Sequence, residues 1–209
     1  MDFSVWLAFF AAAWAISLSP GAGAVAAMSA GVAHGFVRGY VMTFGLVLGI
    51  WTQVLVVGVG LGALIAASAL AFAIVKWVGV AYLVWLGLRQ WRAPGTPLAD
   101  GADAPAAVWS ARALFLRGWA VNAVNPKGTV FLLAVVPQFL DPAQPLGPQY
   151  LVIAATLGFT DLVVMAGYTA LAARVLRMLR RPAQVKALNR LFGGLFMVAG
   201  ALLATFKRA

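Results

Sequence analysis

Long apolar segments occupy most of this chain, at residues 3–33, 39–67, 69–91, 112–140, 148–173 and 187–206. Each is long enough for a membrane-crossing helix, which needs about 20 residues. Only 10% of the 209 residues are charged, whereas a soluble domain has about a quarter. Short alternating segments typical of membrane β-barrels are absent from the sequence. We therefore predict an all-α membrane protein with six transmembrane helices, whose continuous run from 41 to 88 turns near Ser68.

Two of these segments, the first and the fourth, are interrupted by a polar motif that contains a proline. The motifs are Ser19-Pro20-Gly21 and Asn125-Pro126-Lys127. Proline lacks an N–H group and clashes with the carbonyl one turn earlier, and in hydrocarbon each freed carbonyl must be satisfied by protein or water. Serine and asparagine are good N-caps, and proline is favoured at the first helical position. Each motif is therefore predicted to begin a new half-helix inside the membrane.

A half-helix that begins inside the membrane presents free N–H groups and a positive dipole end, which attract an anion. The freed carbonyls of the preceding half-helix attract a cation. An amino acid is a zwitterion and offers both charges, and transporters use such broken helices at the bilayer midplane. We therefore expect both motifs to bind a zwitterionic small molecule.

The linker at 93–111 is rich in Pro, Gly, Ala and Asp and divides the chain into two halves, repeat one at 1–92 and repeat two at 112–209. Each half begins with a proline-containing segment and ends with a similar helix, KWVGVAYLVWLG from Lys76 and RLFGGLFMVAG from Arg190. Because three helices is an odd number, the second repeat is predicted to be inverted relative to the first. The whole chain is then one transmembrane domain.

The basic residues favour six crossings. With six, eleven of the fifteen Lys and Arg fall on one side, three on the other, and Lys127 within the membrane. If the two proline-containing segments were re-entrant hairpins, the count would be seven on each side. Basic loops lie in the cytoplasm, so both termini are predicted outside it. The same rule explains the basic run at 174–190, for which an anionic-lipid site is the alternative.

Lys127 and Asp161 are ionisable residues expected near the middle of the membrane. Counted from opposite faces, they lie about 21 Å and about 18 Å into their segments. A static ion pair that fixes helix packing is one interpretation of the two residues. The other, which we favour, is that Asp161 takes up protons and couples them to substrate movement, because ionisable groups inside membranes are usually functional.

Other polar residues in the apolar segments either complete a cavity or form hydrogen bonds between helices. They are Thr52, Gln53, Asn122 and Thr160. Among them we assign Gln53 and Asn122 to the substrate site. A set of glycines is expected to permit close helix packing instead. They are Gly45, Gly49, Gly79, Gly87, Gly193 and Gly194.

Composition excludes several other functions. There is no cysteine and a single histidine, His34, so thiolate and histidine-cluster metal sites and paired-cysteine electron carriers are excluded. The net charge of +10 does not indicate nucleic acid, because the charges lie at the ends of apolar segments. We expect no enzyme activity, metal or cofactor. An inorganic-ion or other small-solute exporter stays the alternative, although an ion site would need several ligands.

Three stretches of the sequence are similar to a known family. They are SPGAGA at 19–24, KWVGVAYLVWLGLRQWR at 76–92 and FLRGWAVNAVNPKGTVFLLAVVPQFLDP at 115–142. On these motifs the chain resembles the lysine exporter/homoserine–threonine resistance family of bacterial amino-acid exporters. Ala22 stands where the family motif has a second proline.

The resemblance implies six helices in the bacterial inner membrane and export of amino acids or their derivatives, driven by proton exchange. It assigns both proline motifs to the transport core. The expected partners are the substrate, protons and membrane lipids. A homodimer is compatible with so small a transporter, although no residue indicates one.

Overall fold

The structure is a computed structural model that describes residues 1–67, 69–94, 109–172 and 182–205. In this part of the chain there are eight α-helices, one 3₁₀ turn and no strand, which confirms the all-α fold class. The elements are α1 (Phe3–Leu18), α2 (Ala22–Gly39), α3 (Val41–Ala67), α4 (Ala69–Arg92), α5 (Ala111–Ala123), α6 (Pro126–Val135), η2 (Val136–Gln138), α7 (Leu146–Ala170) and α9 (Pro182–Thr205).

The helices follow the predicted segments closely, with two differences. The predicted loop at 34–38 belongs to α2, where only Gly35 leaves the helical conformation, with φ +72°. The last helix begins at Pro182, five residues before the predicted start at 187, because proline is accepted in the first turn of a helix. The predicted turn at Ser68, most of the linker 93–111 and residues 173–181 of the basic run lie outside the described residues.

Within the described residues, Val41–Gly60 and Leu146–Ala170 are each long and apolar enough to cross a membrane. Two bent helix pairs also qualify if each counts as one span: α1 with α2, and α5 with α6. The structure thus has two to four candidate spans. Many large apolar side chains on the outer faces are exposed, such as Leu55 on α3 and Leu151 on α7. Such an exposed apolar surface suits contact with lipid.

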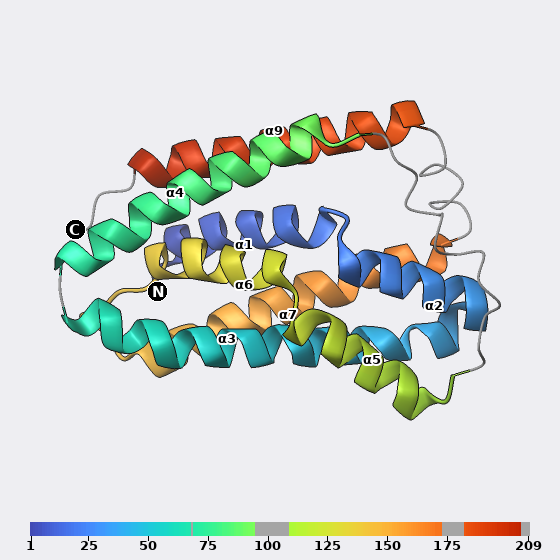
Figure 1. Cartoon of the computed structure of the whole chain (residues 1–209). Coiled ribbons are helices and arrows are strands. Elements are labelled where there is room, and N and C mark those ends of the chain that lie inside the picture. The colour runs from blue at the N-terminus through green and yellow to red at the C-terminus, as the bar shows by residue number, and fades with distance from the viewer. Residues whose placement is uncertain (68, 95–108, 173–181, 206–209) are drawn as a thin grey trace.

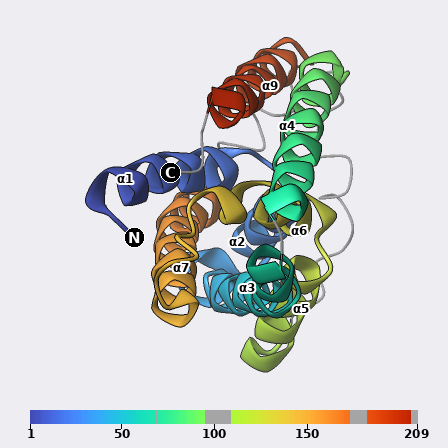
Figure 2. The same cartoon turned by 90° about the vertical axis from the view of Figure 1, so that its left-hand side faces the viewer.

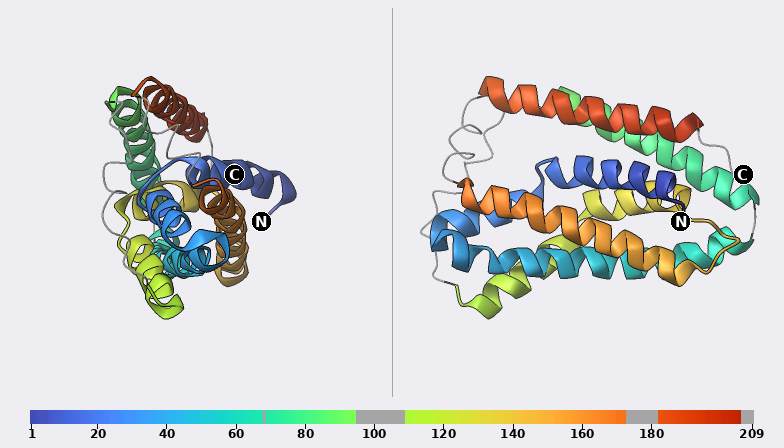
Figure 3. Two further views of the ribbon diagram at one scale, coloured as in Figure 1. Left: turned by 90° about the vertical axis from the view of Figure 1, so that its right-hand side faces the viewer. Right: turned by 180° about the vertical axis from the view of Figure 1, so that it is seen from behind.

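Successive passes of the chain run in opposite directions along one long axis. In Figure 1, α1 and α2 run from the end that holds the N-terminus to the other end, α3 returns, and α4 runs out again. The second half begins in the reverse sense, because α5 and α6 run toward the end with the N-terminus. The view from behind in Figure 3 shows α7 and α9 completing the alternation.

Glycines allow two of the closest helix contacts. A Cβ atom on Gly45 of α3 would overlap the carbonyl oxygen of Phe115 on α5. Gly87 of α4 and Gly193 of α9 face each other, and a Cβ on either would lie 2.6–2.7 Å from the other's carbonyl oxygen. The predicted packing role is thus confirmed for these three glycines. Figure 2 shows that α4 and α9 form a pair to one side of the remaining helices.

The buried apolar side chains form two clusters, separated along the long axis. One, around Phe9, Phe131 and Ile153, joins α1 and α6 to the first half of α7. The other, around Met28 and Leu114, joins α2 and α5 to the second half of α7. The two helix breaks lie between these clusters, where polar side chains are buried. A polar layer between two apolar cores is therefore the part of the fold that needs a functional explanation.

Candidate substrate cavity

The first break separates α1 from α2 and bends the pair by 56°. Ser19 is extended, with φ −69° and ψ 115°, because a residue before proline avoids the helical conformation. The prediction that Ser19 caps a helix beginning at Pro20 is wrong. Gly21 is the N-cap of α2 instead, and it offers no side-chain cap. Three residues therefore remain outside either helix, and among the described residues no side chain is bonded to the N–H groups at the start of α2.

The second break separates α5 from α6 and bends that pair by 51°. Here the prediction is confirmed. Asn125 is the N-cap of α6, its side-chain oxygen accepts a hydrogen bond from the backbone N–H of Lys127 at 3.1 Å, and Pro126 is the first helical residue. The start of α6 is thus partly satisfied by its own sequence.

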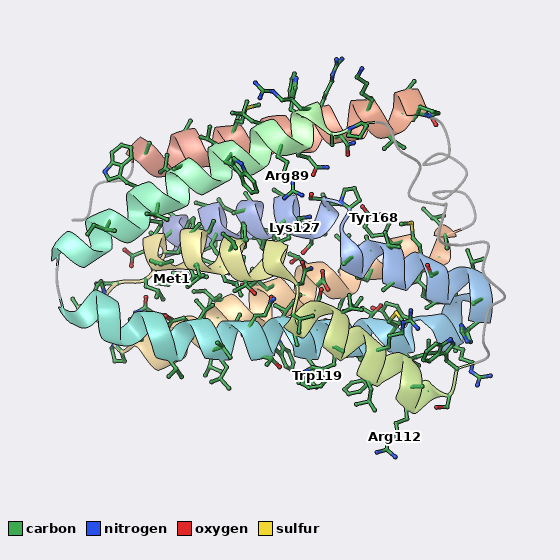
Figure 4. All side chains as sticks on the ribbon, in the orientation of Figure 1. Met1, Arg89, Arg112, Trp119, Lys127 and Tyr168 are labelled. Carbon is green, nitrogen blue, oxygen red and sulfur yellow. The ribbon has the colours of Figure 1, made fainter. Side chains whose placement is uncertain are left out.

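Side chains form hydrogen bonds to backbone carbonyl groups at both breaks. The Lys127 ammonium donates to the carbonyl oxygen of Ser19 at 2.7 Å, which joins the second break to the first. The Gln53 side-chain nitrogen donates to the carbonyl oxygen of Asn125 at 2.8 Å and to the Thr129 hydroxyl, also at 2.8 Å. Lys127 lies midway along the molecule between the two broken pairs (Figure 4). The two breaks and α3 therefore form one connected polar unit.

A cavity of about 70 Å³ opens where the two breaks meet, which is room for several water molecules. Its polar lining residues are Ser17, Ser19, Gln53, Asn122, Asn125, Lys127 and Asp161. Gly21 and Gly23 contribute backbone to the wall. Its apolar wall consists of Ile16, Ala24, Ile50, Phe131, Leu132, Leu157 and Met165. The structure thus brings together seven residues of the predicted site, and among the described lining residues Pro20 is absent. The seven are Ser19, Gly21, Gln53, Asn122, Asn125, Lys127 and Asp161.

Asp161 and Ser19 present buried polar atoms to this cavity. Asp161 is 5% exposed, and its Oδ2 atom has no hydrogen-bond partner in the described part of the chain. Ser19 is 4% exposed, and its hydroxyl likewise has no partner there. Lys127 and Asp161 are close enough for their charges to interact. The cavity therefore contains one positive and one negative side chain, and the carboxylate has hydrogen-bonding capacity to spare.

The remaining predicted polar residues divide between the two interpretations given to them. Asn122 lines the cavity and also donates to the Leu46 carbonyl oxygen at 3.0 Å. Thr160 forms a hydrogen bond between helices, with Ser17 at 3.1 Å. Thr52 is not among the cavity-lining residues; it accepts a hydrogen bond between helices from the Trp119 indole N–H at 3.2 Å and donates within its own helix to the Leu48 carbonyl oxygen.

Three residues of this polar layer were missed by the sequence argument. Tyr168 donates to the carbonyl oxygen of Leu18 at 2.8 Å, which satisfies another group freed by the first break. Thr129 joins the second break to Gln53. Ser17 of α1 lines the cavity and hydrogen-bonds with Thr160 of α7 at 3.1 Å. In the sequence, these residues are marked only by a hydroxyl group inside an apolar segment. Thr52 has the same feature but is not among the cavity-lining residues, so the feature does not predict a place in the site.

A membrane-type helical fold in which two broken helices meet at an internal polar cavity is the architecture of a solute translocator. Residues 14–206 match the family described as LysE type translocator, so the chain belongs to this family, whose members are transporters rather than enzymes. This finding confirms the resemblance carried by the proline motifs.

Curated relatives cover the whole chain. It is 46% identical over 210 residues to a homoserine/homoserine lactone efflux protein of Salmonella typhimurium, with all of both chains covered. It is 44% identical to an uncharacterized membrane protein of Vibrio cholerae, over 99% of this chain and all of that one. A leucine efflux protein of an Enterobacter species is 30% identical over 92% of each chain. No solved structure matches the chain.

Proposed function

We propose that this protein is a secondary exporter that carries small amino acids or their derivatives out of the bacterial cytoplasm through the cavity between its two helix breaks. The observation that carries the proposal is the meeting of both breaks with one ammonium and one carboxylate in a single buried cavity. A zwitterion needs groups of both signs, and broken helices at such a site are how secondary transporters build one.

The substrate class follows from the cavity and from the relatives. Two relatives are named for export of homoserine, its lactone and leucine. All three substrates carry an ammonium group and a carboxyl group or its ester. The cavity wall combines the polar groups of the breaks with short apolar side chains such as Ile16, Ile50 and Leu157. A compact aliphatic or hydroxylated side chain fits this wall, and we propose homoserine-like solutes as the substrates.

Six crossings in two inverted repeats are supported by the reversed direction of the second half (Figure 1). The packing is also reciprocal. The first half-helix of each repeat packs against the unbroken helix that follows the break in the other repeat, α1 on α7 and α5 on α3. The second half-helices do the same, α2 on α7 and α6 on α3. Rocking of one repeat against the other around the shared cavity would expose it to each side in turn.

The orientation that we propose places both termini outside the cytoplasm. Arg38 at the end of α2, Arg92 at the end of α4 and Arg112 at the start of α5 lie toward the same end of the molecule, opposite the N-terminus (Figures 1 and 4). Asp2 directly precedes α1 and Asp141 lies between η2 and α7, and both helices begin toward the other end (Figure 1). Basic residues mark the cytoplasmic side of inner-membrane proteins.

A proton gradient is the proposed source of energy, and Asp161 is the proposed proton site. Asp161 is the one carboxylate on the cavity wall, in the middle of α7, and a buried ionisable group at this depth is a candidate for a proton relay.

Efflux from intact cells tests the proposed function. Bacteria that lack the gene are preloaded with dipeptides, and release of homoserine, leucine and lysine is compared for the wild type, Lys127→Ala and an empty vector. We expect faster homoserine release with the wild type than with the empty vector. We also expect Lys127→Ala to lose most of this activity, because it removes the hydrogen bond to the Ser19 carbonyl oxygen.

Lys186→Ala removes an exposed lysine of α9 and is the matched control, which should keep wild-type efflux. Equal release of every amino acid by all strains would reject the proposal. Release of inorganic ions instead of amino acids would favour the alternative function for the same fold.

A further inference from the structure

The two half-helix starts at the cavity differ in what they offer to a ligand. The start of α6 is capped by the Asn125 side chain, whereas α2 has no side-chain cap. Beside the open start of α2 lie the Ser19 hydroxyl, which has no partner in the described structure, and the Lys127 ammonium. A Cβ atom built on Gly21 would lie 3.5 Å from Lys127 Nζ. N–H donors, a hydroxyl and an ammonium together form a site for an oxygen that carries negative or partial negative charge.

Across the same cavity, Asp161 offers the opposite chemistry. Its carboxylate is 95% buried, and its Oδ2 atom has no hydrogen-bond partner in the described residues. A buried carboxylate oxygen without a donor is costly. An ammonium group on a ligand would supply both the donor and the opposite charge.

The Ser19 carbonyl oxygen is less suited to bind the ligand's ammonium, although the sequence predicts that freed carbonyls bind it. It already accepts a hydrogen bond from Lys127 at 2.7 Å. The Asn125 carbonyl oxygen is likewise engaged, by Gln53 at 2.8 Å. Asp161 is the negatively charged group that lines the cavity with capacity to spare.

We propose that the substrate's ammonium binds the Asp161 carboxylate while its carboxyl or ester oxygen binds the first break, at the Ser19 hydroxyl, the Lys127 ammonium and the start of α2. The inference rests on the exporter function proposed above and assigns the two ends of the substrate within the same cavity. It implies that a substrate ammonium and a proton compete for one carboxylate. A single site then exchanges substrate for proton, and no separate proton site is needed.

Few titratable groups other than Asp161 can produce a pH dependence of binding. Of the helices packed against α7, neither α1 nor α3 carries a titratable side chain. Lys127 reaches the cavity from α6. Tyr40, between α2 and α3, bonds through its hydroxyl to the Leu162 carbonyl oxygen next to Asp161 and interacts with the Asp161 charge. His34 and Arg38 of α2 lie near its far end.

Binding to the purified full-length wild-type protein, measured by calorimetry in detergent, tests the assignment without any mutation. The probes are homoserine, homoserine lactone and N-acetylhomoserine, which has the same carboxylate but no ammonium. We expect homoserine and the lactone to bind, and N-acetylhomoserine to bind at least about 30-fold more weakly, as for loss of one partner of a buried charged pair. Homoserine affinity should fall as the pH is lowered, while its amine remains protonated.

Variants provide the second arm. Asp161→Asn should weaken homoserine binding by about 30-fold or more and remove the pH dependence. Asp2→Asn removes an exposed carboxylate whose side chain caps no helix and should change neither. Equal binding of N-acetylhomoserine and homoserine by the wild type would overturn the assignment. An unchanged homoserine affinity and pH profile in Asp161→Asn would overturn it as well.

The efflux measurement keeps the two proposals distinguishable. If wild-type cells export homoserine and the acetylated compound binds equally well, the assignment of the two ends is wrong and the exporter stands. If wild-type cells export no amino acid and the purified protein binds none of the probes, both proposals fail.

Discussion

The break between α1 and α2 and the break between α5 and α6 bend their helix pairs by similar angles, 56° and 51°, and each contains one proline. Their polar groups are used differently. At the second break Asn125 caps α6 and Gln53 bonds to its carbonyl oxygen, so most of this break is held by hydrogen bonds within the protein. At the first break the helix start is uncapped and the Ser19 hydroxyl has no partner in the described residues.

The difference indicates a division of labour between two similar motifs. A half-helix start that is satisfied by its own side chain is a structural support, and one left open can receive a ligand. Lys127 connects the two breaks. Its backbone lies in the first turn of α6 at the second break, and its ammonium donates to the Ser19 carbonyl oxygen at the first. Three tests, two with a pair of variants and one with a single variant, would break or sharpen this comparison.

Crowding the second break should have the largest effect on stability. In Gly128→Ala, the new Cβ would lie 2.5 Å from Gln53 Oε1, so the Gln53 amide must shift and its hydrogen bonds to Asn125 and Thr129 are strained. We expect the free energy of unfolding to fall by about 1–3 kcal/mol. Gly167→Ala, on α7 with no atom within 4 Å of its Cβ position, is the control and should not be destabilised. Thermal unfolding in detergent measures both, and equal stability of the two variants would contradict the supporting role of the second break.

Removing the polar side chain of each break should separate support from binding. Asn125→Ala removes the cap of α6 and should lower the free energy of unfolding by about 1 kcal/mol. Ser19→Ala removes a hydroxyl that caps nothing and has no partner in the described structure, so stability should hold while homoserine affinity falls. Unfolding and binding measured on the same samples check this. The comparison fails if Ser19→Ala is the more destabilised of the two.

Restoring the second proline of the first motif should have the smallest effect. Ala22 is the first residue of α2, the position that accepts proline best, and its side chain is exposed. Ala22→Pro should raise the free energy of unfolding by about 0.4–1 kcal/mol through reduced freedom of the unfolded chain. Homoserine efflux should persist. A large loss of stability would show that the N–H group of residue 22 has an essential partner.

Local sequence rules predicted the second break fully and the first only in part. Asn125 with Pro126 is a strong helix start, and the structure has it. Ser19 with Pro20 has the same signature, yet α2 begins at Ala22. The carbonyl oxygen of an N-cap residue accepts the first hydrogen bond of its helix, but Ser19 ends α1 and its carbonyl oxygen accepts a hydrogen bond from Lys127 instead. Competition from a residue 108 positions away is invisible to a local pattern.

The sequence by itself determined that the chain is all-helical and apolar, where its helices are interrupted, and to which family it belongs, because hydropathy, proline and short motifs act over a few residues. Only the tertiary structure decided which polar residues face one another. Lys127, Asp161, Gln53 and Asn122 line one cavity, while Thr52 and Thr160 bond elsewhere. The physical reason is that a polar side chain in an apolar helix must find a partner somewhere, and the rotation and packing of neighbouring helices select that partner.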